Sequence, residues 1–252
     1  IEGVQFMWKH IVERKQGCVI AHSMGLGKSI QTVTFVTTLL DTMAKNTQLG
    51  PTLDRFKSKR ILLLAPLTTL SNWVSEFDKW RPPECQDTGG NIYNYAATTD
   101  ASASRRLGYL RHWYNDGGIL LMSYEQFRSS VLKEGNDPLL RTMLVDPGPS
   151  LLIADEAHRI KNSQSQLTLA IQQIRTRARI CLTGSPIQNN LSEFYCVVDF
   201  ACPDYLPNEQ EFKYMYTRPI QNVFTDSSSS DIYLAKKQLF KLQLLTSDIM
   251  LR

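Results

Sequence analysis

The chain has 252 residues, with 28 lysine and arginine residues against 24 aspartate and glutamate residues, so its net charge is a mild +4. A hydrophobic fraction of 42% excludes a disordered chain, and the lack of any apolar run of roughly 18 residues excludes a membrane-spanning helix. The charge permits a nucleic-acid partner without requiring one. Five cysteines without a C-x-x-C pair predict a reducing, intracellular compartment rather than a disulfide framework or a zinc site. The first residue is not methionine, which predicts a piece of a longer protein.

Short apolar runs alternate along the chain with longer amphipathic segments. The apolar runs are 18–21, 61–65, 119–122, 151–154 and 180–183, with 91–95 as a weaker candidate. Runs of this kind, apolar on both faces, suit buried parallel strands. The amphipathic segments 29–43, 70–80, 103–114 and 167–174 carry apolar residues at helical spacing. The alternation predicts a doubly wound α/β fold, in which a parallel sheet lies between two layers of helices.

Three parts of the chain depart from this alternation. Residues 45–59 are polar and predict a surface insertion, and consecutive serines make 225–231 a predicted flexible loop. After residue 202 no strand-like run occurs, whereas 209–216 and 232–245 have helical patterns, so a helical appendage is predicted there. Arg175, Arg177 and Arg179 alternate ahead of the last apolar run, and we predict that they lie on the surface.

The segment 22–29, His-Ser-Met-Gly-Leu-Gly-Lys-Ser, lies between an apolar run and an amphipathic helix, which is the context of a phosphate-binding loop. Gly25 and Gly27 would let the backbone turn and point its N–H groups at phosphate oxygens. Lys28 would neutralise the β- and γ-phosphates of ATP, and the Ser29 hydroxyl would ligate Mg²⁺. His22 stands where the standard pattern has glycine. An ordinary glycine turn that caps a helix is the simpler alternative.

Two carboxylates follow the apolar run 151–154, which leads directly into Asp155 and Glu156. In P-loop nucleotide hydrolases an aspartate at such a strand end holds Mg²⁺, and a neighbouring glutamate can accept a proton from the attacking water. A helix N-cap is the alternative for such a pair. The phosphate-binding loop upstream favours the catalytic interpretation, in which Lys28, Asp155 and Glu156 act together.

The residues 155–158, Asp-Glu-Ala-His, form a DEAH box, and the chain resembles the first RecA-like lobe of a superfamily 2 helicase-type ATPase. More narrowly, the loop at 24–29 resembles that of the Snf2 family of double-stranded-DNA translocases, and 21–24 resemble its ATRX-like branch. The resemblance implies a three-layer P-loop (RecA-like) sheet with helices on both faces and a helical C-terminal protrusion. It assigns 1–202 to the ATP-binding lobe and 203–252 to the protrusion, and it implies a second RecA-like lobe that these residues lack.

The resemblance also assigns site residues. Those implied to bind ATP are Gln5, Met24, Gly25, Leu26, Gly27, Lys28 and Ser29. Those implied to contact DNA phosphates are Pro66, Thr68, Thr69 and Ser123. Those implied to couple the Mg²⁺ carboxylates to the DNA-binding elements are His158, Thr183, Ser185 and Gln188. Simpler alternatives stay open, because threonines and serines at strand ends also cap helices, and Thr-Gly-Ser-Pro at 183–186 is also an ordinary turn.

The implied function is ATP hydrolysis coupled to movement along duplex DNA, in chromatin remodelling or DNA repair. The implied protein is nuclear, with nucleosomes or other chromatin proteins as possible partners and no membrane. Because the second lobe would supply arginine fingers to the ATP site, the isolated lobe is expected to be nearly inactive. Two alternatives remain, a DEAH-type RNA helicase lobe and a non-catalytic module that binds DNA or chromatin. The sequence Ile-Lys-Asn at 160–162 and the helical C-terminal part disfavour the first, and the presence of Lys28, Asp155 and Glu156 disfavours the second.

Overall fold

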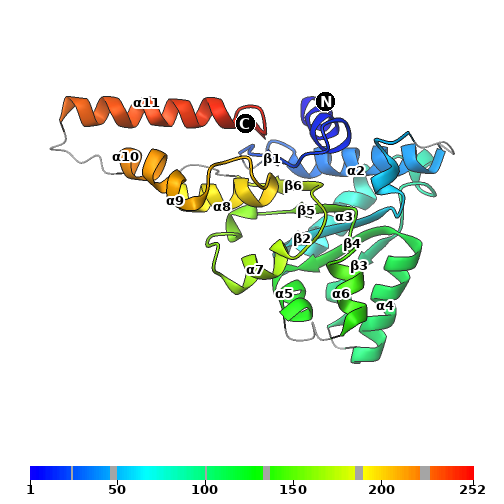
Figure 1. Ribbon diagram of the computed structural model, residues 1–252. Helices are drawn as coiled ribbons and strands as arrows, with labels where there is room; N and C mark the ends of the chain where they lie inside the picture. Colours follow the sequence, from blue (N-terminus) through cyan, green and yellow to red (C-terminus); the bar gives the residue numbers. More distant parts are fainter. Residues whose placement is uncertain (24, 46–49, 100, 133–136, 185–189, 222–227) are drawn as a thin grey trace.

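A parallel β-sheet between two layers of helices forms the centre of the computed structural model (Figure 1). The model describes residues 1–23, 25–45, 50–99, 101–132, 137–184, 190–221 and 228–252. The strands are β1 (Cys18–Ile20), β2 (Arg60–Ala65), β3 (Ile92–Asn94), β4 (Gly118–Ser123), β5 (Leu151–Ala154), β6 (Arg179–Leu182) and β7 (Met250–Leu251). Their order in the sheet is β3-β4-β2-β5-β6-β1-β7, and every neighbouring pair is parallel. The predicted α/β class is confirmed, and each predicted apolar run coincides with a strand.

Helices connect these strands. The α-helices are α1 (Glu2–Met7), α2 (Lys28–Lys45), α3 (Leu70–Trp80), α4 (Ala103–Asp116), α5 (Tyr124–Leu132), α6 (Pro138–Leu144), α7 (Gln166–Gln172), α8 (Leu191–Ala201), α9 (Glu209–Phe212), α10 (Arg218–Gln221) and α11 (Ser229–Thr246). Two π-helical segments, η1 (Trp8–Glu13) and η7 (Lys213–Thr217), continue α1 and α9. Single 3₁₀ turns are η2 (Asp54–Phe56), η3 (Leu67–Thr69), η4 (Pro83–Cys85), η5 (Tyr95–Thr98) and η6 (Ala157–Arg159). In these described ranges no helix is long and apolar enough to cross a membrane.

Each face of the sheet has its own hydrophobic core. Along β2, Leu62 and Leu64 belong to a cluster with α4, α5, α6, α7 and α8, whereas Ile61 and Leu63 belong to one with α1, α2 and α3. These strand side chains are almost fully buried. Burial of each large apolar side chain contributes about 1.5–3 kcal/mol to the stability of the fold. Burial on both faces explains why the strands read as continuous apolar runs in the sequence.

The helix α8 was not predicted, because its sequence is apolar on nearly all sides. Most of its residues are buried, including Phe194, Val198 and Phe200. A helix that is buried all round has no polar stripe, so the helical period that reveals α2 and α3 is hidden. The shorter α5 and α6 were also missed, since nine and seven residues give only two turns of pattern.

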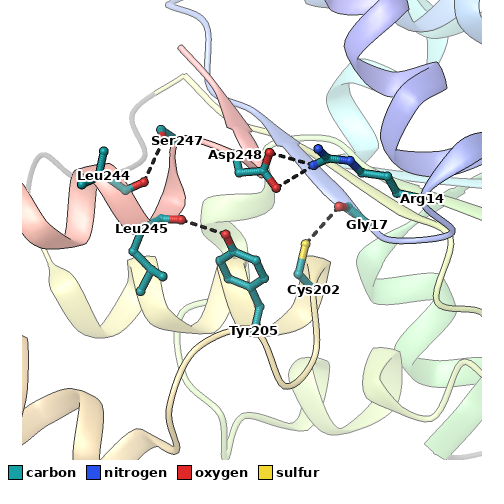
Figure 2. A network of polar contacts seen from close by, with 8 residues as sticks. All are labelled: Arg14, Gly17, Cys202, Tyr205, Leu244, Leu245, Ser247 and Asp248. Carbon is teal, nitrogen blue, oxygen red and sulfur yellow. Dashed lines mark hydrogen bonds and ion pairs between the residues drawn. The ribbon is translucent and has the colours of Figure 1, made fainter.

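The C-terminal segment returns to the sheet, which corrects the prediction that no strand follows residue 202. Helices α9, α10 and α11 extend away from the sheet (Figure 1), and the chain then forms β7, which pairs with β1. A strand of two residues gives no detectable sequence pattern. Figure 2 shows the polar contacts at this return: the Arg14 guanidinium donates to both Asp248 carboxylate oxygens, at 2.7 and 2.6 Å, and the Tyr205 hydroxyl donates to the Leu245 carbonyl oxygen at 2.8 Å.

Two other predicted loops can be compared with the structure: the serine-rich loop needs correction, whereas the described residues of the polar insertion lie mostly at the surface. In the segment 225–231, Ser228 is the N-cap of α11 and accepts a hydrogen bond from the Asp231 N–H at 3.2 Å, so 229–231 are helical; 225–227 lie outside the described residues. Serine at an N-cap explains this start. In the predicted surface insertion 45–59, residues 46–49 are outside the described part, and Phe56 is only 1% exposed. Its burial anchors that segment to the core around α2.

Arg179 is buried rather than on the surface, contrary to the prediction for this arginine cluster. It is 6% exposed, and its guanidinium donates to the carbonyl oxygens of Thr176, Ile174 and Phe200 at 2.8, 2.7 and 3.0 Å. Phe200 lies in the last turn of α8, where carbonyl groups lack helical partners, and Ile174 lies just beyond the C-cap of α7. One cation therefore ties two helix ends to the start of β6.

Candidate active site

The predicted catalytic groups lie at the carboxyl edge of the parallel sheet. Because all strands run the same way, the residues that follow them meet at one edge, as in other open α/β sheets. The loop after β1 leads to Lys28, Asp155 follows β5 directly, and β6 lies between these two strands. Thr183 follows β6 on the same edge, where its N–H donates to the Ile20 carbonyl oxygen at 3.0 Å. The structure thus brings the phosphate-loop lysine and the carboxylates together from positions far apart in the sequence.

The loop between β1 and α2 has the backbone that phosphate binding requires. Positive φ values occur at Gly25 (+83°) and Gly27 (+73°) but not at His22. Only glycine adopts such values without strain, so the two glycines are needed while the position of His22 accepts a side chain. The Lys28 Nζ donates to the carbonyl oxygens of His22 and Ser23, at 2.8 and 3.2 Å. Lys28 and Ser29 form the first turn of α2, whose N-terminus favours anions. Met24 lies outside the described residues.

A cavity of about 350 Å³ lies beside this loop, between α1 and α2. It is lined by Ile1, Val4, Gln5, Ile30, Gln31 and Thr34. Gln5 is an exposed residue on α1, so its amide is available to a ligand there. The Gln31 amide donates to the Leu26 carbonyl oxygen at 3.1 Å and joins the loop to α2. Sequence reasoning missed Gln31, because a glutamine inside an amphipathic helix gives no signal of a contact with the preceding loop.

Asp155 accepts three hydrogen bonds. Its Oδ1 accepts from the Glu156 N–H at 2.9 Å, its Oδ2 accepts from the Trp73 indole N–H at 2.8 Å, and its carbonyl oxygen accepts from the Tyr124 hydroxyl at 2.6 Å. Burial raises the pKa of the Asp155 carboxyl, and the Trp73 hydrogen bond and the Lys28 charge offset part of that rise. The contact with Trp73 was not predicted, since the sequence places that residue on the apolar face of α3.

Glu156 has a left-handed backbone, with φ of +49° and ψ of +50°. Such a conformation is uncommon for a residue other than glycine, and it recurs at functional sites. The Glu156 Oε2 lies 3.1 Å from the His158 Nδ1. The Arg159 guanidinium, in the turn η6 that follows Glu156, forms an ion pair with Glu125 of α5 at 2.9 Å. This ion pair connects the turn to α5. His158 therefore contacts the carboxylate predicted to be the base. Ser185 and Gln188, two other residues predicted to couple the carboxylates to the DNA-binding elements, lie outside the described residues.

The turn η3, which follows β2 at Pro66, presents an exposed hydroxyl at the same edge. Thr68 is exposed, whereas the Thr69 hydroxyl donates to the Pro66 carbonyl oxygen at 3.0 Å. Thr69 is the N-cap of α3, but its side chain makes no capping hydrogen bond. The Thr69 side chain therefore does not cap α3. The exposed Thr68 hydroxyl is the one in this turn that is available to contact a phosphate.

Ser123, the other predicted DNA contact, has a different environment. It is buried at the end of β4, its hydroxyl accepts from the Gln126 N–H at 3.1 Å, and its own N–H donates to the Gln126 Oε1 at 3.1 Å. These reciprocal bonds form a capping box at the start of α5. The capping alternative thus describes Ser123 in this structure.

The residues predicted to hold Mg²⁺ have suitable chemistry. Each carboxylate oxygen of Asp155 accepts one hydrogen bond, which leaves further lone pairs, and the Ser29 hydroxyl begins the neighbouring helix. Mg²⁺ prefers oxygen ligands and is bound through one or two protein groups together with phosphates and water. The loop at 25–28 is open above Gly25: among the described residues, apart from Gly25 and its chain neighbours, no heavy atom lies within 4 Å of the point that a Cβ on Gly25 would occupy. Over the described ranges, no cluster of three or more His, Cys, Asp or Glu side chains could hold a metal by itself.

Comparison with a family model and with curated proteins identifies one family. The model of the SNF2-related domain matches residues 1–252. A transcriptional regulator ATRX homolog from Drosophila melanogaster is 35% identical over 251 residues, covering 94% of this chain and 18% of the fly protein. The human helicase ARIP4 is 32% identical, with 94% of this chain and 18% of that protein covered. The Arabidopsis thaliana protein chromatin remodeling 20 is 35% identical, with 94% and 16% covered. The chain thus spans less than a fifth of these relatives.

A solved structure has the same fold. The Sulfolobus solfataricus SWI2/SNF2 ATPase core, determined in complex with double-stranded DNA, matches with a TM-score of 0.68 at 22% identity, covering all of this chain and 42% of that one. At this identity the likeness concerns the fold. The family resemblance predicted from the sequence motifs, including its ATRX-like branch, is confirmed by these relatives.

Proposed function

Because the chain belongs to the SNF2-related family, we propose that it is the ATP-binding lobe of an ATP-dependent translocase that moves along double-stranded DNA and remodels chromatin. The single observation that carries this proposal is the meeting of Lys28, Asp155 and Glu156 at one sheet edge, with the exposed Thr68 on the same edge. Residues 1–202 would form the lobe, and 203–252 the protrusion that begins and ends on it.

ATP would lie along the loop after β1. Its phosphate oxygens would replace the two carbonyl oxygens that Lys28 now contacts, and the backbone N–H groups from Gly25 to Ser29 would complete the phosphate site. Its base would occupy the cavity beside Gln5. Ser29 and Asp155 would hold Mg²⁺, which when bound neutralises charge on the phosphates. These chain residues therefore bind and orient the nucleotide.

Glu156 would act as the general base. Its carboxylate follows the Mg²⁺-holding Asp155 and can accept the proton of the water that attacks the γ-phosphate. The His158 contact orients that carboxylate. Thr183, buried after the strand between the two halves of the site, would transmit movement of the site to the chain that follows it.

DNA would be contacted through its phosphates at the turn 66–69, so that recognition would be tolerant of sequence and sensitive to salt. A second RecA-like lobe elsewhere in the full-length protein would supply arginine fingers, so residues 1–252 alone should hydrolyse ATP very slowly. The names of the relatives support a chromatin setting, and we propose a nuclear protein with nucleosomes as partners.

We predict that duplex DNA raises the ATP hydrolysis rate of the full-length protein at least about tenfold, because DNA binding aligns the two lobes around the nucleotide. The measurement is steady-state phosphate release with duplex DNA, with single-stranded RNA of equal length, and with neither. Stimulation by RNA but not by duplex DNA would instead identify a DEAH-type RNA helicase. Absence of any hydrolysis would indicate a non-catalytic module.

A further inference from the structure

Two aromatic side chains on different helices donate hydrogen bonds to the same residue, Asp155. The Trp73 indole N–H reaches the Asp155 Oδ2 at 2.8 Å, and the Tyr124 hydroxyl reaches the Asp155 carbonyl oxygen at 2.6 Å. Trp73 is 3% exposed and Tyr124 is fully buried. Both donors are therefore buried while the hydrogen bonds themselves are partly buried, and a hydrogen bond removed from bulk water is stronger and more costly to lose.

Trp73 connects the turn 66–69 with the carboxylate of the proposed metal site. It lies on the first turns of α3, a helix that begins at Leu70, directly after the turn that carries Thr68. The Asp155 N–H also donates to the Leu64 carbonyl oxygen at 2.8 Å, on the strand that leads into this turn. A displacement of the turn relative to β5 would therefore change the position of the indole donor relative to Asp155.

Tyr124 makes a parallel connection from the next strand of the sheet. It follows Ser123 at the end of β4 and begins α5, and its ring lies 5.8 Å from the Arg159 guanidinium on the loop behind Glu156. Its hydroxyl fixes the main chain at Asp155 rather than the carboxylate itself. The two aromatic residues thus hold the side chain and the backbone of one residue.

The choice of acceptor distinguishes Trp73 from an ordinary core tryptophan. The fully buried Trp113 satisfies its indole N–H with the nearby Gly118 carbonyl oxygen at 3.1 Å, within the same connection between α4 and β4. Trp73 instead donates to a carboxylate 82 positions away in the sequence. Hydrogen bonds to a charged acceptor are about twice as strong as those between neutral groups.

We propose that Trp73 and Tyr124 are positioning residues that link the turn 66–69 after β2 and the neighbouring end of β4 to Asp155, so that DNA bound at this turn sets the orientation of the metal-binding carboxylate. This inference rests on the proposed function of the site. Trp73 acts on the carboxylate directly and should have the larger effect, whereas Tyr124 acts through the backbone.

The test compares the full-length protein with Trp73→Phe, which keeps an aromatic ring but removes the donor, and with Tyr124→Phe, which removes only the hydroxyl. The matched control is Trp80→Phe on the same helix, because the exposed Trp80 indole donates to the Glu76 carboxylate at 3.1 Å in a bond that is open to solvent. The first readout is the Mg²⁺ concentration for half-maximal binding of a fluorescent ATP analogue without DNA. The second is the ratio of hydrolysis rates with and without duplex DNA, and the third is DNA affinity.

We expect Trp73→Phe to raise the required Mg²⁺ concentration and to lower the stimulation ratio, each by about tenfold, as loss of a charged hydrogen bond implies. Tyr124→Phe should shift both quantities the same way by about threefold, and neither variant should change DNA affinity by more than about twofold. The proposal is overturned if Trp73→Phe matches Trp80→Phe in both readouts. If Trp73→Phe does not fold, as judged by thermal unfolding, Tyr124→Phe decides by the same comparison. If duplex DNA does not raise the hydrolysis rate of the wild-type protein, the proposed function is refuted. The Mg²⁺ concentration for half-maximal nucleotide binding would still test the contact between Trp73 and Asp155.

Discussion

The variant Glu156→Gln of the full-length protein is expected to lose ATP turnover by about a hundredfold or more while its affinity for ATP stays within a few-fold of wild type. The amide has the size of the carboxylate but cannot accept a proton from water. The groups proposed to hold the nucleotide, Lys28, Ser29 and Asp155, are left in place. Loss of turnover without loss of binding is therefore the signature of a missing base.

The control for this variant is Glu125→Gln. Glu125 is near the DEAH box through its ion pair with Arg159, but its side chain is half-exposed and contacts none of the groups proposed to bind ATP. Exposed ion pairs of this kind contribute about 0–1 kcal/mol to stability, so turnover should stay unchanged. Steady-state hydrolysis and equilibrium binding of a fluorescent ATP analogue separate the two quantities. Turnover by Glu156→Gln within a few-fold of wild type would refute the role of Glu156 as the base.

The variant Arg179→Met is expected to lower the free energy of unfolding by about 3–5 kcal/mol. Methionine keeps the unbranched apolar stem but removes all three hydrogen bonds to the carbonyl oxygens of Thr176, Ile174 and Phe200. Those carbonyl groups would be left in a site that Arg179 now shields, two of them in the segment after α7 and one in the last turn of α8. Burial lowers the pKa of Arg179, because removal from water disfavours the charged guanidinium.

Arg177→Met is the matched control, two positions away. Its side chain is 69% exposed and pairs at 3.4 Å with Asp204, which is itself 83% exposed, so the variant should change stability by less than about 0.5 kcal/mol. Denaturant unfolding of residues 1–252, followed by circular dichroism, measures both variants. Equal midpoints for Arg179→Met and Arg177→Met would show that the buried guanidinium does not join the helix ends as described.

The strands and the longer amphipathic helices could be predicted from the sequence because local composition determines them. A run such as 61–65 is apolar at every position only if both faces are covered, and α3 alternates buried Trp73 and Phe77 with polar residues at helical spacing. The apolar α8 and the two-residue β7 lack such a local pattern, since their positions depend on packing with distant parts of the chain.

The same distinction applies to the site. Lys28 and Asp155 could be predicted because a glycine loop before a helix, and carboxylates after a strand, are themselves local signals. Trp73 and Arg179 could not, because the sequence shows only an apolar helix face and a basic strand end. Their roles depend on an acceptor that the fold brings close, at Asp155 and at the carbonyl groups of Phe200 in α8 and Ile174 after α7.

The most direct measurement of the proposed motor is displacement of a third strand from triplex DNA by the full-length protein. If ATP hydrolysis at the Lys28–Asp155–Glu156 site moves the protein along a duplex, the third strand should be released when ATP and Mg²⁺ are present. It should stay bound without ATP or with Glu156→Gln. Hydrolysis that duplex DNA stimulates, but that leaves the third strand bound, would contradict translocation.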